Sequence, residues 1–437
     1  MLKRRIGQRL KEWKDTAGHN PVIIKGCRQC GKTFSVLDFA KKSYGNVVYI
    51  NFFETPAYSS IFSGSLAVDD LTVYMSAVLG SDAKFVPNDT CIILDELQEC
   101  PNARTALKFF KIDGRYDVIC TGSLLGLDGY RSGARSVPVG YETIINMYPL
   151  DFGEFLWACG INDNVTALLK NCLKNEIPVP EPVHEKMREL LLRYVAIGGM
   201  PAVVSAYLES GDMNTVLQMQ RDIIGGYEDD MVKYASTADK GRIRDCFRSI
   251  PAQLAKEYKK FQYSGVRKGA GAKDYAGCLQ WIEDAGIIRR CHNLRITELP
   301  LEGNTIWTEF KVYMSDIGLL TAMLEEGSQR DIIMGSLLGY KGAIFENLVA
   351  DILGKAGHKL YYFRKESGLE LDFIIRQNGE CIPLEAKAST GNAKSLKTVL
   401  SHPEKYHISK AIKFGDYNIG RSGTVLTLPL YMAYFLG

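Results

Sequence analysis

A glycine-rich segment near the start of the chain constrains its fold more than any other feature. The apolar residues 22–24 lead into Gly26, and after four intervening residues the sequence reads Gly31-Lys32-Thr33. In a G-x-x-x-x-G-K-[ST] loop, the glycines let successive backbone N–H groups turn toward a phosphate, the lysine neutralises phosphate oxygens, and the hydroxyl reaches Mg²⁺. Apolar spacing over residues 35–42 predicts a helix whose N-terminus favours the same phosphate. The segment therefore predicts a strand, a phosphate-binding loop and a helix, in that order.

A second apolar run ends in the acids that such a site needs. Residues 91–94 are apolar, and Asp95 and Glu96 follow them. A buried parallel strand carries both acids to the carboxyl edge of its sheet, where Asp95 can hold Mg²⁺ through water and Glu96 can polarise the attacking water. We predict catalytic roles for Glu96 and Lys32, and contacts to Mg²⁺ for Thr33 and Asp95. The predicted nucleotide-binding residues are Gly26, Cys27, Arg28, Gln29, Cys30, Gly31, Lys32, Thr33, Phe34 and Asp95.

Small hydroxyls and two arginines complete the predicted nucleotide site. The next apolar strand, residues 116–120, is followed by Thr121 and Ser123. Either hydroxyl can sense the γ-phosphate, and we assign that role to Ser123, although a Ser/Thr turn that caps a helix explains the same residues. Arg131 and Arg135 follow in a Gly/Ser-rich loop. Arg135 is the predicted arginine finger, in cis or in trans, and an exposed loop arginine without a role is the alternative.

Composition restricts the class of protein. At 437 residues the chain is too long for one ordinary core, so two or three domains are expected. No run of eighteen apolar residues occurs and no signal-peptide core follows the basic start, so we expect a cytoplasmic protein with no membrane partner. A net charge of +3 neither requires nor excludes nucleic acid as a partner.

The eleven cysteines are scattered, which fits a reducing compartment. Cys27 and Cys30 form a C-x-x-C pair inside the phosphate loop, but no second pair completes a zinc site. Two interpretations stay open. The cysteines are either tolerated variable positions of the loop, or an oxidation-sensitive element of the nucleotide site, because a helix N-terminus favours a thiolate.

The chain contains, in order, the motifs GCRQCGKT, IILDELQE and CTGSLLG, a Gly-Ala-Arg loop, VPVGYETIINMYPLDFGEFL and YVAIGGMPAVV. Together they resemble a prokaryotic family of AAA-type ATPases with a conserved C-terminal domain of unknown function. The resemblance implies an additional-strand P-loop core with sheet order 5-1-4-3-2, ATP as the nucleotide, and the usual roles for Lys32, Thr33, Asp95 and Glu96.

The middle of the chain carries weaker signals. Residues 239–294 read as helix, turn and helix, then a strand from Ile287, and this resembles a winged helix whose third helix is residues 276–285. Residues 256–273 interleave basic and aromatic side chains, as a phosphate-contacting surface does. A solvated helix end, or a domain that contacts only proteins, is the alternative.

A second chemical constellation lies in the last third. Residues 361–364 and 371–375 are predicted to pair as strands, and in the strand after them Glu385 and Lys387 face one side. Asp372 and Glu385 can then hold a divalent cation while Lys387 orients water without being a ligand, which is the equipment for phosphodiester hydrolysis. This resembles the PD-(D/E)xK restriction-endonuclease-like core, which implies Glu346 as a further acid. The alternative is that Lys387 pairs with Asp372 or Glu385 and no metal binds.

These observations predict an α/β protein: an AAA-like, additional-strand P-loop domain, then a helical and winged-helix region and a restriction-endonuclease-like α/β domain. The predicted parts are an ATP-binding domain at 1–160, a helical connecting region at 161–235, a winged-helix-like region at 236–325 and a PD-(D/E)xK nuclease-like domain at 326–437.

Two functions remain open. One is a Mg²⁺-dependent ATPase whose nucleotide state repositions the nuclease-like region on double-stranded DNA or on a protein partner. The other is a nucleotide-gated regulatory binding module with little turnover and no nuclease activity. DNA-stimulated turnover would favour the first, and tight ATP binding without turnover would favour the second.

Overall fold

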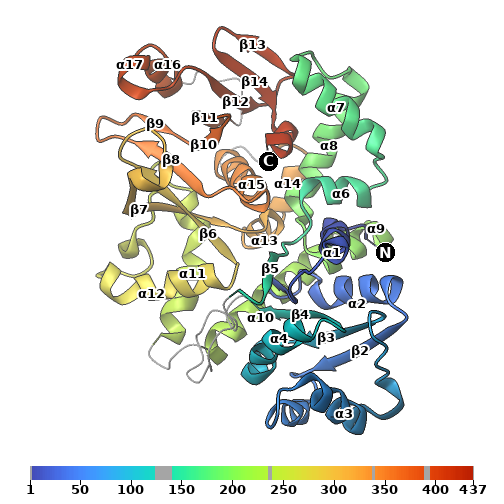
Figure 1. The fold of residues 1–437 in the computed structure, drawn as a ribbon. Coiled ribbons are helices and arrows are strands. Elements are labelled where there is room, and N and C mark those ends of the chain that lie inside the picture. The colour runs from blue at the N-terminus through green and yellow to red at the C-terminus, as the bar shows by residue number, and fades with distance from the viewer. Residues whose placement is uncertain (1, 124–139, 235–238, 337–339, 388–393, 437) are drawn as a thin grey trace. The chain divides into compact units, whose positions relative to one another are not determined.

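The computed structural model describes residues 2–123, 140–234, 239–336, 340–387 and 394–436 (Figure 1). The chain forms two compact units, and each is described here by itself. The first comprises residues 3–149 with residues 284–286, and the second comprises Leu2, residues 150–283 and residues 287–437. None of the helices in the described ranges is both long and apolar enough to span a membrane.

The first unit is built on a five-stranded parallel sheet in the order β2-β3-β4-β1-β5. Read from the other edge this is 5-1-4-3-2, so the predicted strand order is confirmed. The elements of this unit are α1 (Arg5–Asp15), β1 (Val22–Gly26), α2 (Lys32–Ser43), β2 (Asn46–Asn51), α3 (Val68–Leu79), β3 (Thr90–Asp95), α4 (Pro101–Asp113), β4 (Asp117–Ser123) and β5 (Thr143–Asn146).

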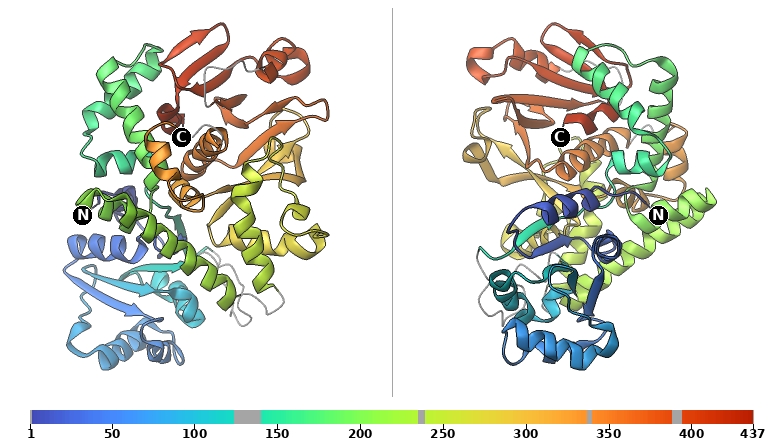
Figure 2. Two further views of the ribbon diagram at one scale, coloured as in Figure 1. Left: turned by 180° about the vertical axis from the view of Figure 1, so that it is seen from behind. Right: turned by 45° about the vertical axis from the view of Figure 1, so that its right-hand side comes forward.

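Helices cover both faces of this sheet, with α2 on one face and α3 on the other (Figure 2). Because successive side chains of a strand point to opposite faces, every second residue of β1 to β4 enters a core that also contains Leu71 and Met75 of α3 and Leu107 and Phe110 of α4. Burial on both faces explains why β1 and β3 are buried along their whole length, and why both appear in the sequence as continuous apolar runs.

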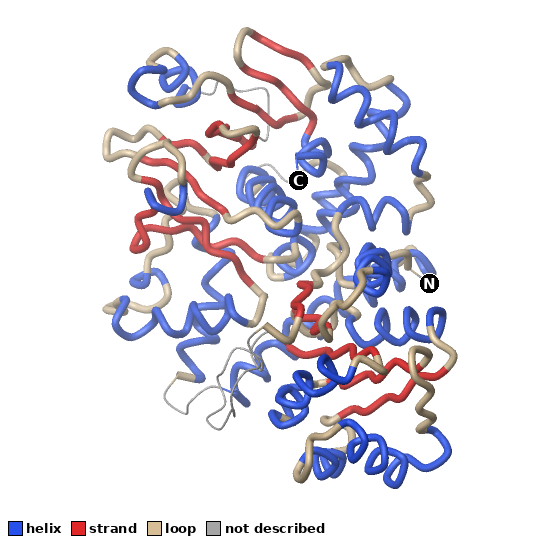
Figure 3. The backbone as a smooth tube through the Cα atoms, in the orientation of Figure 1, coloured by secondary structure: helices blue, strands red, loops and turns tan. Residues whose placement is uncertain are grey.

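The second unit begins with helices and contains two sheets, and its described strands all lie between residues 288 and 429 (Figure 3). The sheet orders are β7-β6-β8-β9 and β10-β11-β12-β14-β13. Its helices are α6 (Phe152–Ala158), α7 (Asp163–Asn175), α8 (Glu181–Ile197), α9 (Pro201–Ser210), α10 (Met213–Tyr234), α11 (Lys240–Leu254), α12 (Ala272–Asp284), α13 (Ile317–Ala322), α14 (Ser328–Ile333), α15 (Lys341–Lys355), α16 (Lys394–Leu400) and α17 (Pro403–Tyr406). Its strands are β6 (Ile288–Leu294), β7 (Thr305–Met314), β8 (Leu360–Arg364), β9 (Glu370–Leu371), β10 (Phe373–Gln377), β11 (Glu380–Ala386), β12 (Ala411–Gly415), β13 (Gly420–Ser422) and β14 (Val425–Pro429).

The predicted strand pairing around Asp372 is only partly correct. Residues 371–375 are predicted to form one strand beside residues 361–364, but only the short β9 from this segment pairs with β8, and β10 pairs with β11 in the other sheet. The break falls at Asp372, whose Oδ2 accepts a hydrogen bond from the backbone N–H of Ala386 at 2.9 Å. This hydrogen bond holds Asp372, the residue between β9 and β10, against the end of β11.

The predicted third helix and wing correspond to α12 and to the antiparallel hairpin of β6 and β7. However, β6 also pairs in parallel with β8, so the hairpin is part of a larger mixed sheet. The winged-helix interpretation therefore stays a prediction, as do the predicted domain boundaries.

Candidate nucleotide-binding site

The loop between β1 and α2 has the backbone that its glycines predict. Gly31 precedes α2 in the left-handed region with φ 90°, and Gln29 is also left-handed with φ 63°. A Cβ at Gly26 would lie 2.3 Å from the backbone oxygen of Met147, so only glycine fits at the start of the loop. The path from β1 into α2 is therefore tight, and it leaves the loop packed against the end of β5.

Lys32 is folded over this loop. Its Nζ donates to the backbone oxygens of Gly26 at 3.0 Å and of Cys27 at 2.9 Å, and the residue is buried. A buried ammonium requires such acceptors. The two carbonyls hold the charge at the N-terminus of α2, where a helix already favours an anion.

Asp95 is the centre of a dense hydrogen-bond cluster at the carboxyl edge of the sheet. Its carboxylate accepts from the hydroxyl of Thr33 at 3.0 and 3.1 Å, from the hydroxyl of Tyr49 at 2.8 Å, and from the hydroxyl of Thr121. The side-chain amide of Asn51 lies 3.4 Å from the same carboxylate. Burial and the bond to Asp95 raise the pKa of Tyr49, so this phenol stays a donor. The two residues predicted to contact Mg²⁺, Thr33 and Asp95, are thus adjacent.

Glu96 has an uncommon backbone conformation for its residue type. Its φ is 54°, in the left-handed region, where a non-glycine residue is strained by of order 1–3 kcal/mol. Its backbone N–H donates to Asp95 at 3.1 Å, and its carboxylate accepts from the side-chain amide of Gln98 at 2.5 Å. Such strain is typical of functional positions, and here it turns the chain sharply directly after Asp95.

The two sensor candidates differ in their surroundings. Thr121 is fully buried and donates to Asp95, so its hydroxyl supports the carboxylate. Ser123 ends β4 and is the register partner of Gly26, at the beginning of the loop. Arg131 and Arg135 lie outside the described residues.

Sequence reasoning missed three residues of this site. Tyr49 and Asn51 lie two apart on β2, and Asn51 is the register partner of Asp95, so the strand register rather than a local pattern places them here. Arg4 donates to the backbone oxygens of Cys30 at 3.1 Å and Tyr148 at 2.7 Å. No local pattern marks Arg4, because both of its acceptors are backbone atoms far away in the sequence.

Glu346, the predicted extra acid of the nuclease-like site, is held by cations. It accepts from Lys311 at 2.9 Å, from Lys259 and from the hydroxyl of Tyr313. Burial alone would raise its pKa, but Lys311 and Lys259 outweigh burial and lower the pKa of Glu346 to about 2. The buried Lys311 also pairs with Glu370 at 2.7 Å.

Glu385 has the opposite electrostatic setting. Burial and the charge of Asp372 raise the pKa of Glu385 to about 9, although Lys387 lies 2.8 Å from its carboxylate. Among the residues that the structure describes, no three His, Cys, Asp or Glu side chains are grouped so as to hold a metal ion. Glu346 is paired with Lys311 and Lys259, and the described residues form no ligand set in which it joins Asp372 and Glu385.

Family models match three consecutive parts of the chain. An AAA domain matches residues 18–156, a domain of unknown function (DUF8612) matches residues 188–330, and a second domain of unknown function (DUF4143) matches residues 341–431. None of the curated proteins compared with the chain matches it.

Several solved structures are similar over most of their length. The Walker-type ATPase PABY2304 of Pyrococcus abyssi is 16% identical with a TM-score of 0.44, and the match covers 74% of this chain and 96% of that one. The ORC2 protein of Aeropyrum pernix is 16% identical with a TM-score of 0.39, over 76% of this chain and 93% of that one. The RuvB Holliday junction branch migration motor of Thermotoga maritima is 14% identical with a TM-score of 0.29, over 66% and 90%.

These TM-scores are too low to establish a shared overall fold, so the assignment rests on the matched models and on the strand order. Residues 18–156 match an AAA domain and fold around a parallel sheet in the order 5-1-4-3-2, and two regions that match domains of unknown function follow, of which the C-terminal one is DUF4143.

Proposed function

We propose that the first unit binds ATP with Mg²⁺ and hydrolyses it. The observation that carries the proposal is the hydrogen bond of the Thr33 hydroxyl with the Asp95 carboxylate. It lies beside the loop that starts at Gly26, a position where only glycine fits. The residues fit the cation, because a hydroxyl and a buried carboxylate are oxygen donors of the kind that Mg²⁺ prefers. Mg²⁺ would be held by Thr33 directly and by Asp95 through water, and it would neutralise charge on the phosphates.

Each described residue then has a physical role. Lys32 exchanges its two carbonyl acceptors for phosphate oxygens, and the backbone N–H groups after Gly26 orient the same anion. Tyr49, Asn51 and Thr121 fix the orientation of the Asp95 carboxylate. Glu96 orients water and accepts its proton. Ser123 as the γ-phosphate sensor and Arg135 as the arginine finger complete the proposal.

The test is to measure ATP binding and turnover on the purified full chain, with and without Mg²⁺ and with and without duplex DNA. We expect Mg²⁺-dependent binding. Turnover that DNA increases would support an ATPase that repositions its C-terminal region, whereas tight binding with negligible turnover would support a nucleotide-gated regulatory module. A reduced, folded chain that does not bind ATP at millimolar concentration would contradict the proposal.

A second candidate function concerns the second unit, where Lys387 lies 2.8 Å from the Glu385 carboxylate and the charge of Asp372 acts on Glu385. We propose that this part keeps a PD-(D/E)xK arrangement, in which Asp372 and Glu385 bind a divalent cation and Lys387 orients water. The observation that favours it is the adjacent carboxyl pair: burial and, after it, the charge of Asp372 raise the pKa of Glu385. Two carboxylates forced together are tolerated when a proton or a cation separates them. Glu346 would join the site only after Lys259 and Lys311 release it.

This candidate predicts that Mn²⁺ binding depends on pH. The proton that Glu385 holds below about pH 9 must leave before a cation binds, so the affinity for Mn²⁺ should rise by up to about tenfold per pH unit between pH 6 and 9. Isothermal titration with Mn²⁺ alone measures this. Glu385→Gln should weaken binding and remove most of the pH dependence.

The matched control is Glu380→Gln, on the same strand but exposed and paired with Lys410. It should leave the affinity for Mn²⁺ unchanged. Equal Mn²⁺ affinity in Glu385→Gln and in the unaltered chain, together with no nicking of plasmid DNA in Mn²⁺, would leave only the structural alternative in which Lys387 fills the site.

A further inference from the structure

Two cysteines form part of the phosphate loop itself. Cys27 and Cys30 are both buried, with 5% and 0% of their surface exposed. The Cys27 thiol hydrogen-bonds to the sulfur of Cys30, and the Cys30 sulfur lies 3.7 Å from the backbone oxygen of Met147. The two sulfurs are therefore neighbours within the loop whose N–H groups face the nucleotide phosphates.

Cys30 differs electrostatically from the other cysteines. The hydrogen bond from Cys27 is the largest influence on it, and with Lys32 and Arg4 it outweighs burial and lowers the pKa of Cys30 to about 6. Burial instead raises the pKa of eight other cysteines, which are Cys91, Cys100, Cys120, Cys159, Cys246, Cys278, Cys291 and Cys381. The thiolate is the reactive form of cysteine, so a small oxidant that reaches the buried loop should attack Cys30 before the eight cysteines whose pKa burial raises.

We propose that Cys27 and Cys30 are a redox modification site: a hydroperoxide converts them to a disulfide, and the closed disulfide lowers the affinity of the loop for ATP. The inference rests on the proposed nucleotide site. It goes beyond that proposal because it assigns a chemical function to two loop positions that phosphate binding does not require to be cysteine.

The chemistry is balanced without any further reactant. The Cys30 thiolate attacks the peroxide, an S–O bond forms, the O–O bond breaks, and the alcohol or water leaves with a proton. The Cys27 sulfur then displaces water from the sulfenic acid of Cys30 as the S–S bond forms. Two thiols and one hydroperoxide become one disulfide, one alcohol and one water, and the peroxide takes up two electrons. A dithiol reverses the change by exchange.

The loop is packed too closely for the two sulfurs to approach each other without a change in its backbone. A disulfide brings them to about 2.05 Å, which is shorter than any hydrogen bond between thiols. A Cβ at Gly26 would lie 2.9 Å from the Cys30 sulfur, and Arg4 and Lys32 hold the backbone oxygens of Cys30 and Cys27. Since side chains and backbone are packed this closely, closure of the disulfide must turn the peptide groups between the two cysteines. These are the groups that cradle the phosphates.

The effect must be reciprocal. If the disulfide weakens ATP binding by a given factor, ATP must disfavour the disulfide by the same factor. We expect a loss of at least about tenfold in ATP affinity, which corresponds to a shift of about 30 mV in the two-electron potential of the cysteine pair when ATP is saturating.

The experiment treats the full chain with hydrogen peroxide at pH 7.5 and follows two readouts. Mass spectrometry should show the peptide that contains Cys27 and Cys30 becoming lighter by two hydrogens before any other cysteine reacts. Equilibrium dialysis should show the loss of ATP affinity, and dithiothreitol should restore it. Cys27→Ser should form no internal disulfide, and Cys246→Ser, which alters a buried cysteine of the second unit, should respond as the unaltered chain does.

The outcomes distinguish a failure of the redox site from a failure of the proposed ATP binding. A loop that does not become cross-linked, or a cross-linked loop with unchanged ATP affinity, overturns the redox site while ATP binding stands. A reduced chain that binds no ATP yet forms the Cys27–Cys30 disulfide overturns the nucleotide site and the proposed effect on it.

Discussion

The Glu96→Gln variant should still bind ATP with Mg²⁺ but should turn it over about 10²–10⁴ times more slowly. The amide keeps the size of the side chain and the sharp turn after Asp95, but it cannot accept a proton from the attacking water, and a positioned general base contributes a factor of this size. Equilibrium dialysis measures the binding, and phosphate release under saturating ATP measures the turnover.

Two further variants make this result specific. Lys32→Ala should lose measurable ATP binding, because it removes the ammonium that the carbonyls of Gly26 and Cys27 hold at the loop and that would neutralise the phosphates. Glu54→Gln alters an exposed carboxylate that follows β2 at the same edge of the sheet, and its turnover should stay within about twofold of the unaltered chain. Full turnover in Glu96→Gln would show that another group orients the water.

The sequence predicted the first unit well because its signals are local. A run of five buried residues, a glycine loop and a helix occupy neighbouring positions in the chain, and their order leaves few possible folds. The strand order 5-1-4-3-2 came from the resemblance to a family, and the structure confirms it. The hydrogen bonds of Tyr49 and Asn51 with Asp95 depend on strand pairing, which no local pattern reveals.

The second unit was harder to predict because its charges pair across long stretches of sequence. The basic and aromatic residues 256–273 suggested a phosphate-contacting surface. In the structure Lys259 contacts Glu346, Lys260 contacts Glu309 at 2.7 Å, and Phe261 stacks on Phe310. These three side chains of the segment therefore make contacts within the protein. No periodicity in the sequence could reveal partners almost ninety residues away.

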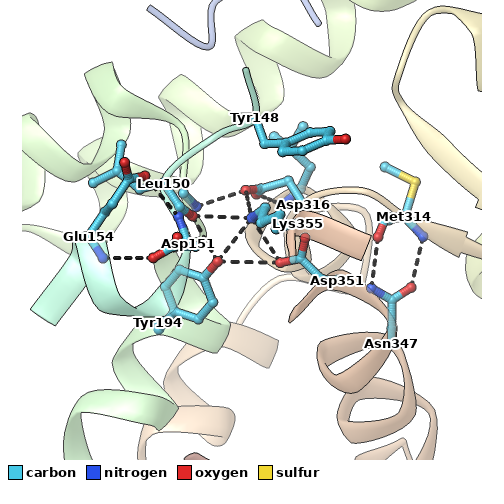
Figure 4. A network of polar contacts seen from close by, with 12 residues as sticks. Tyr148, Leu150, Asp151, Glu154, Tyr194, Met314, Asp316, Asn347, Asp351 and Lys355 are labelled. Carbon is cyan, nitrogen blue, oxygen red and sulfur yellow. Dashed lines mark hydrogen bonds and ion pairs between the residues drawn. The ribbon is translucent and has the colours of Figure 1, made fainter. Parts of the chain in front are cut away.

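A buried charge cluster stabilises the second unit, and it involves Asp316, Asp351 and Lys355 (Figure 4). The Lys355 ammonium lies 2.9 Å from Asp351 and 3.6 Å from Asp316, and it donates to the backbone oxygen of Leu150 at 3.2 Å and to the hydroxyl of Tyr194 at 2.9 Å. All three charged side chains are at most 2% exposed. One ammonium thus faces two buried carboxyl groups, and burial raises the pKa of one of them, Asp351, to about 7.

The same cluster fixes several backbone segments. Asp316 caps α13 by accepting from the backbone N–H of Leu319 at 3.1 Å, and it also accepts from the backbone N–H of Gly199 at 2.8 Å. A Cβ at Gly199 would lie 2.1 Å from the backbone oxygen of Leu150, so the chain approaches itself closely here. Loss of the ammonium would therefore disturb α8, α13 and α15 together.

Lys355→Met should destabilise the second unit by about 3–5 kcal/mol at pH 8, because it leaves buried carboxylates without their cation. Urea unfolding followed by tryptophan fluorescence and circular dichroism measures the difference. The matched control is Lys359→Met, which breaks an ion pair of 2.7 Å with Glu302 in which both side chains are more than half exposed. Exposed ion pairs contribute little to stability because solvent screens them, so the control should change the unfolding free energy little.

The deficit of Lys355→Met should also grow as the pH rises above 7. Burial raises the pKa of Asp351 to about 7 although Lys355 opposes the shift, so the native state holds a proton that the unfolded chain releases near its ordinary value. Such a group costs stability as the pH rises from the unfolded pKa to the folded pKa, and no further above it. In the unaltered chain this loss ends near pH 7. Without Lys355 the folded pKa of Asp351 is higher still. The variant therefore keeps losing stability at pH values where the stability of the unaltered chain no longer changes with this group. A deficit that is the same at pH 6.5 and pH 9 would mean that Asp351 does not depend on Lys355 for its charge.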